Sequence, residues 1–528
     1  MDEPRARETI VDVIAWLLRM LFQGVKLLFG LPFGGRRKNR KNAFGSSRWA
    51  TRFEELWGGM LFGSGVILGR GAWRRLLRFS TDGLVMVFAS TGAGKGLGIV
   101  VPTLLTYKGS MVVTDPKGEN FAITARRRAS FTNVLRLSPT DPLHSARFNP
   151  MDIIRRGTVN EPTDARALAS LMVMPQEGEE NHWDNKSVSL LTALILHVLD
   201  EPASSRNLGT VRRLSVGSPE IFIDTLREIA ESSPSLAAQE IASGALTTAI
   251  GKDKKLTPEY ASIISNMQKA TEIWSNGSPV GTLAGSSSFQ LEDLVNKPTT
   301  IYLCVDEDVL DVYGGWLRVM VGCTLKILTR AKMNPPKRKV MLMLDEVAVL
   351  GRLDTLEKQS GLLRAYCTPV LIWQNLPQIM KIYQGGARAF LANASARVFF
   401  GLNDNDTAGY VATMLGQAPV LSTSTSSSGW GSQSESQSES GYWLLDTAEV
   451  QRLKVNQVII KHRNVAYPVL GRRIDYRRIV WWWGRWDRWR RSSRPVVSQP
   501  PEPPRPEIAP DLPSAPPQSP SIQPQPQA

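Results

Sequence analysis

A loop rich in small residues lies between an apolar run and a lysine early in the chain. Residues 84–88 are all apolar, and residues 89–96 read ASTGAGKG. A buried strand, a glycine-rich turn and a helix form the layout of a phosphate-binding loop, in which backbone N–H groups and the lysine contact phosphates. The predicted phosphate contacts are Ser90, Thr91, Gly92, Ala93, Gly94, Lys95 and Gly96. A tight turn with an exposed lysine is the alternative interpretation.

The loop departs from the usual pattern GxxxxGK followed by Ser or Thr at both ends. Ala89 replaces the first glycine, and Gly96 replaces the hydroxyl residue that normally holds Mg²⁺. Ser90, Thr91 or water would then have to supply that ligand.

Acidic and polar residues follow two later apolar runs. Asp345 and Glu346 follow residues 340–344, and in a nucleoside triphosphatase this aspartate holds Mg²⁺ while the glutamate orients and deprotonates the attacking water. Gln374 follows residues 369–373 and would sense the γ-phosphate. Arg364, on the segment between them, would reach a neighbouring subunit's nucleotide as an arginine finger. The alternatives are an acidic turn and ordinary surface residues.

The elements that would position these side chains are buried strands alternating with helices. Near-continuous apolar runs at 84–88, 110–114, 300–305, 340–344, 369–373 and 397–401 are typical of parallel strands that are buried on both faces. Helical patterns at 312–331 and 352–366 separate some of them. The sequence therefore predicts an α/β fold with a mostly parallel doubly wound sheet, whose ligands lie at the carboxyl ends of the strands. Helical periodicity between about 155 and 285 predicts an all-α insertion.

Six segments, in this order, resemble the type IV secretion coupling protein family, the conjugation ATPases that link a relaxase–DNA substrate to a secretion channel. They read STGAGKGLGIVVPTLL, DPKGEN, FNP, MLMLDEVAVLGRL, QNLPQI and LANASARVFFGLNDNDTA. The Lys-Gly pair in place of Lys-Ser/Thr also resembles that family. The resemblance implies a RecA-like P-loop NTPase domain that uses ATP and Mg²⁺ and is interrupted by an all-α, substrate-selecting domain. Lys95 would contact phosphate, Asp345 would serve Mg²⁺, Glu346 would polarise water and Gln374 would sense nucleotide.

The resemblance also implies partners and a location. The partners would be a relaxase–single-stranded DNA complex, type IV secretion channel components and five further copies of the chain in a hexameric ring at the cytoplasmic face of the bacterial inner membrane. The predicted domains are residues 1–44 (membrane-associated helix and basic flank), 45–154 and 289–492 (nucleotide-binding domain), 155–288 (all-α domain) and 493–528 (disordered proline-rich tail). The same motor could instead carry protein effectors, and a non-hydrolysing nucleotide-binding membrane scaffold is a third possibility.

The N-terminal segment carries the membrane prediction. Residues 10–33 are mostly apolar but include Asp12, Arg19 and Lys26, seven residues apart and so on one helical stripe, and a basic cluster follows at 36–41. A helix lying in the membrane interface is favoured over a spanning helix, with an ordinary amphipathic helix as the alternative. Typical members of the family begin with two spanning helices, whereas this sequence offers one apolar segment.

The overall charge and the C-terminal region point to an anionic partner. The formal net charge is +15, which favours contact with nucleic acid or an anionic membrane surface. Between residues 472 and 494, arginines alternate with tryptophans, a pattern that suits single-stranded DNA or a membrane interface. A buried tryptophan-bearing strand at 479–483 is the alternative. Residues 421–440 are polar and predict a mobile loop.

Overall fold

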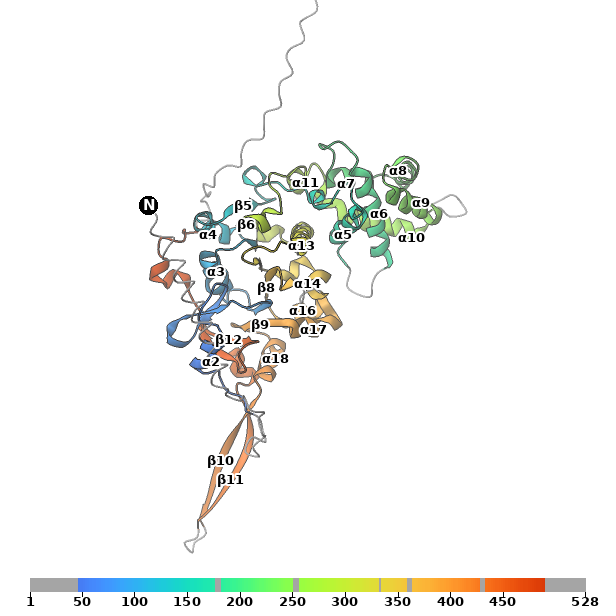
Figure 1. Cartoon of the computed structure of the whole chain (residues 1–528). Coiled ribbons are helices and arrows are strands. Elements are labelled where there is room, and N and C mark those ends of the chain that lie inside the picture. Colours follow the sequence, from blue (N-terminus) through green and yellow to red (C-terminus); the bar gives the residue numbers. More distant parts are fainter. Residues whose placement is uncertain are drawn as a thin grey trace, which may run out of the picture.

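A large sheet forms the centre of this computed structural model, which describes residues 46–175, 182–249, 256–331, 334–358, 363–427 and 433–489 (Figure 1). Its strand order is β2-β1-β13-β12-β9-β3-β8-β7-β4-β6-β5. From β9 to β5 all neighbouring strands are parallel, whereas β12, β13, β1 and β2 pair in antiparallel fashion. The strands are β1 (Val66–Arg70), β2 (Leu76–Phe79), β3 (Leu84–Phe88), β4 (Met111–Asp115), β5 (Asn133–Leu137), β6 (Thr299–Cys304), β7 (Val340–Leu344), β8 (Cys367–Trp373), β9 (Ala394–Phe399), β12 (Gln457–His462) and β13 (Val469–Arg472).

Two hydrophobic cores cover the two faces of the sheet. Along β3, Leu84, Met86 and Phe88 belong to one core, and Val85 and Val87 belong to the other. Successive strand residues face opposite sides, so strands buried on both faces must be apolar throughout. The helices of this part are α2 (Arg52–Trp57), α3 (Val101–Thr106), α4 (Glu119–Ala129), α13 (Gly314–Arg330), α14 (Asp354–Lys358), α16 (Leu376–Tyr383), α17 (Ala387–Asn393), α18 (Asn405–Leu415) and α19 (Thr447–Gln451).

Between β5 and β6 the described chain forms helices and no strand. These helices are α5 (Glu161–Met172), α6 (His182–Val198), α7 (Leu208–Ser215), α8 (Pro219–Ser232), α9 (Leu236–Ala249), α10 (Pro258–Thr271), α11 (Pro279–Ala284) and α12 (Asp293–Asn296). They extend to one side of the sheet, with α8, α9 and α10 farthest from it (Figure 1). The fully buried Asp164 of α5 pairs with Arg330 of α13 at 2.6 Å and with Arg155, which ties the helices to the sheet layer. The α/β fold is thus confirmed, and the exact domain boundaries stay a prediction.

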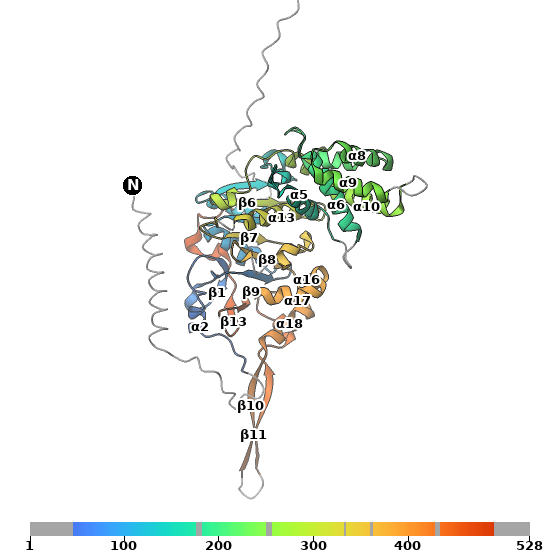
Figure 2. The same ribbon diagram turned by 45° about the vertical axis from the view of Figure 1, so that its right-hand side comes forward.

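One predicted loop is wrong. Residues 421–427 and 433–440, the described part of this segment, lie within a two-stranded antiparallel hairpin of β10 (Gln417–Ser427) and β11 (Gln433–Trp443), which projects from the end of the molecule opposite the helices α8 to α10 (Figures 1 and 2). Residues 422–427 and 433–440 are all polar, so these parts of the strands lack the alternation of apolar and polar residues by which strands are recognised. The tryptophan-bearing strand suggested for 479–483 is also absent. A short 3₁₀ turn, Val480–Trp482, buries Trp482 and exposes Trp481 and Trp483.

The predicted N-terminal membrane helix and the C-terminal tail lie outside the described residues. Across the residues from 46 to 489 that the structure describes, no helix combines the length and the apolar character that crossing a bilayer requires.

Candidate nucleotide-binding site

The phosphate-binding loop joins the carboxyl end of β3 to a short π-helix, Gly96–Val100, that continues into α3. Gly92 and Gly94 have φ angles of +77° and +82°, a backbone conformation that side chains with a Cβ rarely adopt. Gly401, which follows β9, packs closely against the loop at Ala93. A Cβ on residue 401 would lie only 2.6 Å from the Cβ of Ala93, so this close approach requires glycine. The loop therefore has the left-handed glycines that let backbone N–H groups turn toward a bound anion.

Four of the predicted site residues come together at this edge of the sheet. Lys95 Nζ lies 3.1 Å from Asp345 Oδ1 and forms an ion pair with the Glu346 carboxylate. Gln374 Nε2 donates to Glu346 Oε2 at 3.0 Å. They meet because β3, β8 and β7 are adjacent parallel strands, so their carboxyl ends share one edge. Asn375 caps α16 by accepting from the N–H of Gln378, which fixes the turn that carries Gln374.

In this cluster, burial and the attraction between Lys95 and the carboxylates shift the pKa values in opposite directions. Burial raises the pKa of Asp345 above its ordinary value and Glu346 raises it further, while Lys95 lowers it. For Lys95, burial alone would lower the pKa, but the two carboxylates raise it above its ordinary value. Lys95 is therefore a charged ammonium whose present partners are carboxylates, and a phosphate could take their place.

Two features that position the acidic pair were not foreseen from the sequence. Thr114, near the end of the neighbouring strand β4, accepts from the Asp345 N–H at 2.6 Å and donates to the Asp345 carbonyl at 2.8 Å. Glu346 has φ +56° and ψ +49°, a left-handed conformation that is uncommon outside glycine and is often found at functional sites. In the sequence, Thr114 is recognisable only as a threonine one residue before the end of a buried strand. The pairing of β4 with β7 is what shows that it contacts Asp345.

The remaining predicted residues fall into two groups. Ser90, Thr91 and Ala93 lie in the loop, and Gly96 is the first residue of the π-helix that follows it. Arg364 lies just before β8, at the opposite edge of the sheet from Gln374, and is exposed. It is therefore too far along the strand to reach the nucleotide edge of its own subunit, and a role as an arginine finger would require a neighbouring copy.

The aspartate of the DPKGEN segment has a structural role. Asp115 is almost fully buried at the end of β4 and accepts from the backbone N–H groups of Asn120 and Phe121 at the start of α4. Burial raises its pKa to about 6, and these backbone hydrogen bonds oppose that shift. Asp115 therefore stabilises the start of α4.

The side chains of this site could hold Mg²⁺ only if a bound nucleotide supplied further ligands. Within the described ranges, no group of three or more His, Cys, Asp or Glu side chains could hold a metal ion. Asp345 supplies one carboxylate beside the phosphate loop, and Mg²⁺ is commonly bound by one or two carboxylates, water and substrate phosphates. Asp345 would hold the ion, and the ion would neutralise phosphate charge.

Comparisons with known proteins cover most of the chain. Residues 41–479 match the family model described as type IV secretory system conjugative DNA transfer. Protein VirD4 of Agrobacterium fabrum is 31% identical over 348 residues, which cover 64% of this chain and 50% of VirD4. A conjugal transfer protein TraG of Escherichia coli is 28% identical over 421 residues, which cover 71% of this chain and 65% of TraG. The match to the VirD4 proteins of Agrobacterium and Rhizobium thus spans about half of their length.

Solved structures of the bacterial conjugative coupling protein TrwB share the fold. The unbound monoclinic form superposes with a TM-score of 0.62 at 15% identity and covers 83% of this chain and 95% of that one. A complex of TrwB with the ATP analogue ADPNP has a TM-score of 0.60 at 16% identity and covers 84% and 96%. TrwB has also been solved with ADP and Mg²⁺.

Proposed function

Because the chain belongs to the type IV secretory system conjugative DNA transfer family, we propose that it is an ATP-hydrolysing coupling protein that recruits a relaxase–single-stranded DNA complex and delivers it to a secretion channel. The observation that carries the proposal is the convergence of Lys95, Asp345, Glu346 and Gln374 beside a glycine-rich loop. Complexes of the similarly folded TrwB with ADPNP and with ADP and Mg²⁺ support nucleotide binding at this place.

In this proposal each side chain has a distinct task. Lys95 leaves the carboxylates and binds the β- and γ-phosphates, which frees Glu346 to accept a proton from the attacking water. Gln374, hydrogen-bonded to Glu346, responds to the presence of the γ-phosphate. Asp345 holds Mg²⁺, which supplies positive charge to the phosphates.

The partners follow from the family and the charge. The net charge of +15 supports a nucleic acid cargo. The helices α5 to α11 would select the substrate, and a homo-hexamer at the inner membrane would place Arg364 of one copy at the nucleotide of the next. The names of the relatives, which include a "type IV secretion system-coupling protein VirD4" of Bartonella, support the link to a secretion channel.

The experiment compares hydrolysis by the purified full chain with that of Lys95→Ala and Glu346→Gln. We expect both variants to lose at least about 100-fold in rate, since general base catalysis alone contributes about that much. Lys269→Ala, at an exposed lysine of α10 and far from the loop (Figure 1), is the matched control and should keep the wild-type rate. Wild-type rates in all three variants would overturn the proposal, and nucleotide binding without turnover would instead support a scaffold.

A second measurement separates DNA cargo from protein cargo. Gel-shift affinity for single-stranded DNA should fall steeply as salt rises, because each neutralised phosphate releases a counterion. Absence of salt-dependent DNA binding in a protein that hydrolyses ATP would favour protein effectors.

A further inference from the structure

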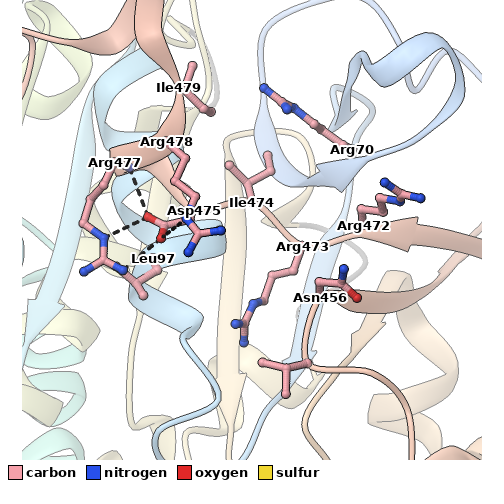
Figure 3. Close-up of a pocket in the computed structure, with 11 residues that line it drawn as sticks. Arg70, Leu97, Asn456, Arg472, Arg473, Ile474, Asp475, Arg477, Arg478 and Ile479 are labelled. Atoms are coloured by element: carbon pink, nitrogen blue, oxygen red, sulfur yellow. Dashed lines mark hydrogen bonds and ion pairs between the residues drawn. The ribbon is translucent and has the colours of Figure 1, made fainter.

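A pocket of about 550 Å³ lies beside the phosphate loop, on the side away from the acidic pair. Figure 3 shows how separate parts of the chain build it: the end of β1, the helix after the loop, the residue before β12 and the segment after β13. Its lining includes Arg70, Leu97, Asn456, Arg473, Ile474 and Asp475. A volume of this size suits a small organic ligand, and the lining mixes apolar groups with arginines.

Arg473 connects this pocket to the loop. If Gly94 had a side chain, its Cβ would lie 3.1 Å from the Arg473 Nη1. If Gly98 had a side chain, its Cβ would lie 3.0 Å from the Arg473 Cγ. Its guanidinium therefore rests against the loop backbone, at a distance that side chains at these two positions would prevent. Gly98 is buried within the helix that follows Lys95, so Arg473 lies along the first turn of that helix.

The Arg473 side chain forms no ion pair within the described part of the chain, although a carboxylate lies two residues away. Asp475 instead accepts from Arg477 at 2.8 Å and 2.9 Å and pairs with Arg478. Figure 3 shows Arg477 and Arg478 converging on Asp475, while Arg473 points away from it. Burial lowers the pKa of Arg473, and because an arginine is protonated far above neutral pH the group keeps its positive charge. An arginine held at a phosphate loop without an anionic partner is suited to bind a phosphate.

The sheet order fixes which end of a nucleotide faces the pocket. On one side of β3 lie β8 and β7, which carry Gln374 and the acidic pair, and on the other lie β9, β12 and β13. The pocket residues belong to the second side. A nucleotide whose γ-phosphate lies near Glu346 would therefore direct its nucleoside across Leu97, two residues beyond Lys95, into the pocket.

We propose that this pocket binds the ribose and base of the nucleoside triphosphate, and that Arg473 contacts its α- or β-phosphate within the same subunit. This inference rests on the proposed function, because it assigns the second half of the same ligand. Leu97 and Val455 offer apolar surface to the base, and Asn456 offers both a donor and an acceptor. The chain thus binds the two ends of the nucleotide with residues that are almost 400 positions apart in sequence.

The test is a titration of the full chain with the fluorescent nucleotide mant-ADP, which reports binding without hydrolysis. Arg473→Ala should weaken binding by about tenfold or more, since a charge-assisted hydrogen bond to phosphate is lost. Arg473→Lys should recover part of the affinity, because it keeps the charge but not the fork of donors. Arg388→Ala, at an exposed arginine of α17, is the control and should bind as the wild type does.

A competition experiment tests the nucleoside pocket without any variant. ADP should displace mant-ADP at much lower concentration than pyrophosphate does, because only ADP fills the pocket. Equal displacement by the two, or equal affinity of Arg473→Ala and Arg388→Ala, would overturn this inference while the proposed function stands. Failure of the wild type to bind ADP at all, both as mant-ADP by fluorescence and unlabelled by calorimetry, would instead overturn the proposed function.

Discussion

Thr114 offers a sharp test of how the acidic pair is positioned. Its hydroxyl is buried and exchanges two hydrogen bonds with the backbone of Asp345, at 2.6 Å and 2.8 Å. Thr114→Val keeps the shape of the side chain but removes both bonds. The Asp345 N–H and carbonyl then lose their partner on β4, and the turn that carries the carboxylate loosens.

The expected cost follows from these two bonds. Each contributes about 1 kcal/mol net, and a buried group left without a partner adds to this, so we expect about 2–3 kcal/mol of lost stability. Residues that orient a metal ligand typically change metal affinity by about 10–100-fold when they are removed. Thr114→Val should therefore raise the Mg²⁺ concentration for half-maximal hydrolysis by about tenfold or more.

The matched control is Thr124→Val. The Thr124 hydroxyl is equally buried and also makes two short hydrogen bonds, to the Asn120 carbonyl and the Tyr302 hydroxyl, both at 2.6 Å. Urea unfolding should show a similar loss of stability in both variants, whereas Mg²⁺ titration of hydrolysis should shift only in Thr114→Val. An unchanged Mg²⁺ requirement in Thr114→Val, or an equal shift in Thr124→Val, would refute the positioning role.

Three further predictions concern other residues. Gly96→Ser should fold, since a Cβ there meets nothing within 4 Å, and its hydroxyl should lower the Mg²⁺ concentration needed for hydrolysis; a raised requirement would contradict this. Burial lowers the pKa of His462 from 6.5 to about 4, so its contribution of about 3 kcal/mol is complete above pH 6.5 and is lost as pH falls toward 4. Urea unfolding at several pH values checks this, and His462→Asn should flatten the profile in that range. Arg364→Ala should abolish hydrolysis but keep mant-ADP binding, whereas loss of binding would argue against a role in a neighbouring subunit.

The sequence predicted the central strands and most of the site because both depend on local pattern. Strands β3, β7 and β8 are buried on both faces, so each appears as an uninterrupted apolar run, and the residues that follow them necessarily share one edge. The hairpin of β10 and β11 lacks any such pattern. Arg473 was part of a conspicuous arginine cluster, but the pairing of β13 with β12 decides which arginine reaches the loop. Contacts between segments that are distant in sequence depend on tertiary packing, so no local sequence pattern predicts them.

The left-handed backbone of Glu346 has a consequence for how this protein can change over time. A residue with a Cβ in this conformation costs on the order of 1 kcal/mol, which glycine would not incur. Glu346→Gly would therefore relieve this backbone cost in a single step, while it removes the proposed base and its bonds to Lys95 and Gln374. Laboratory evolution for thermal stability alone should accept this substitution, whereas selection for the proposed ATP hydrolysis should remove it.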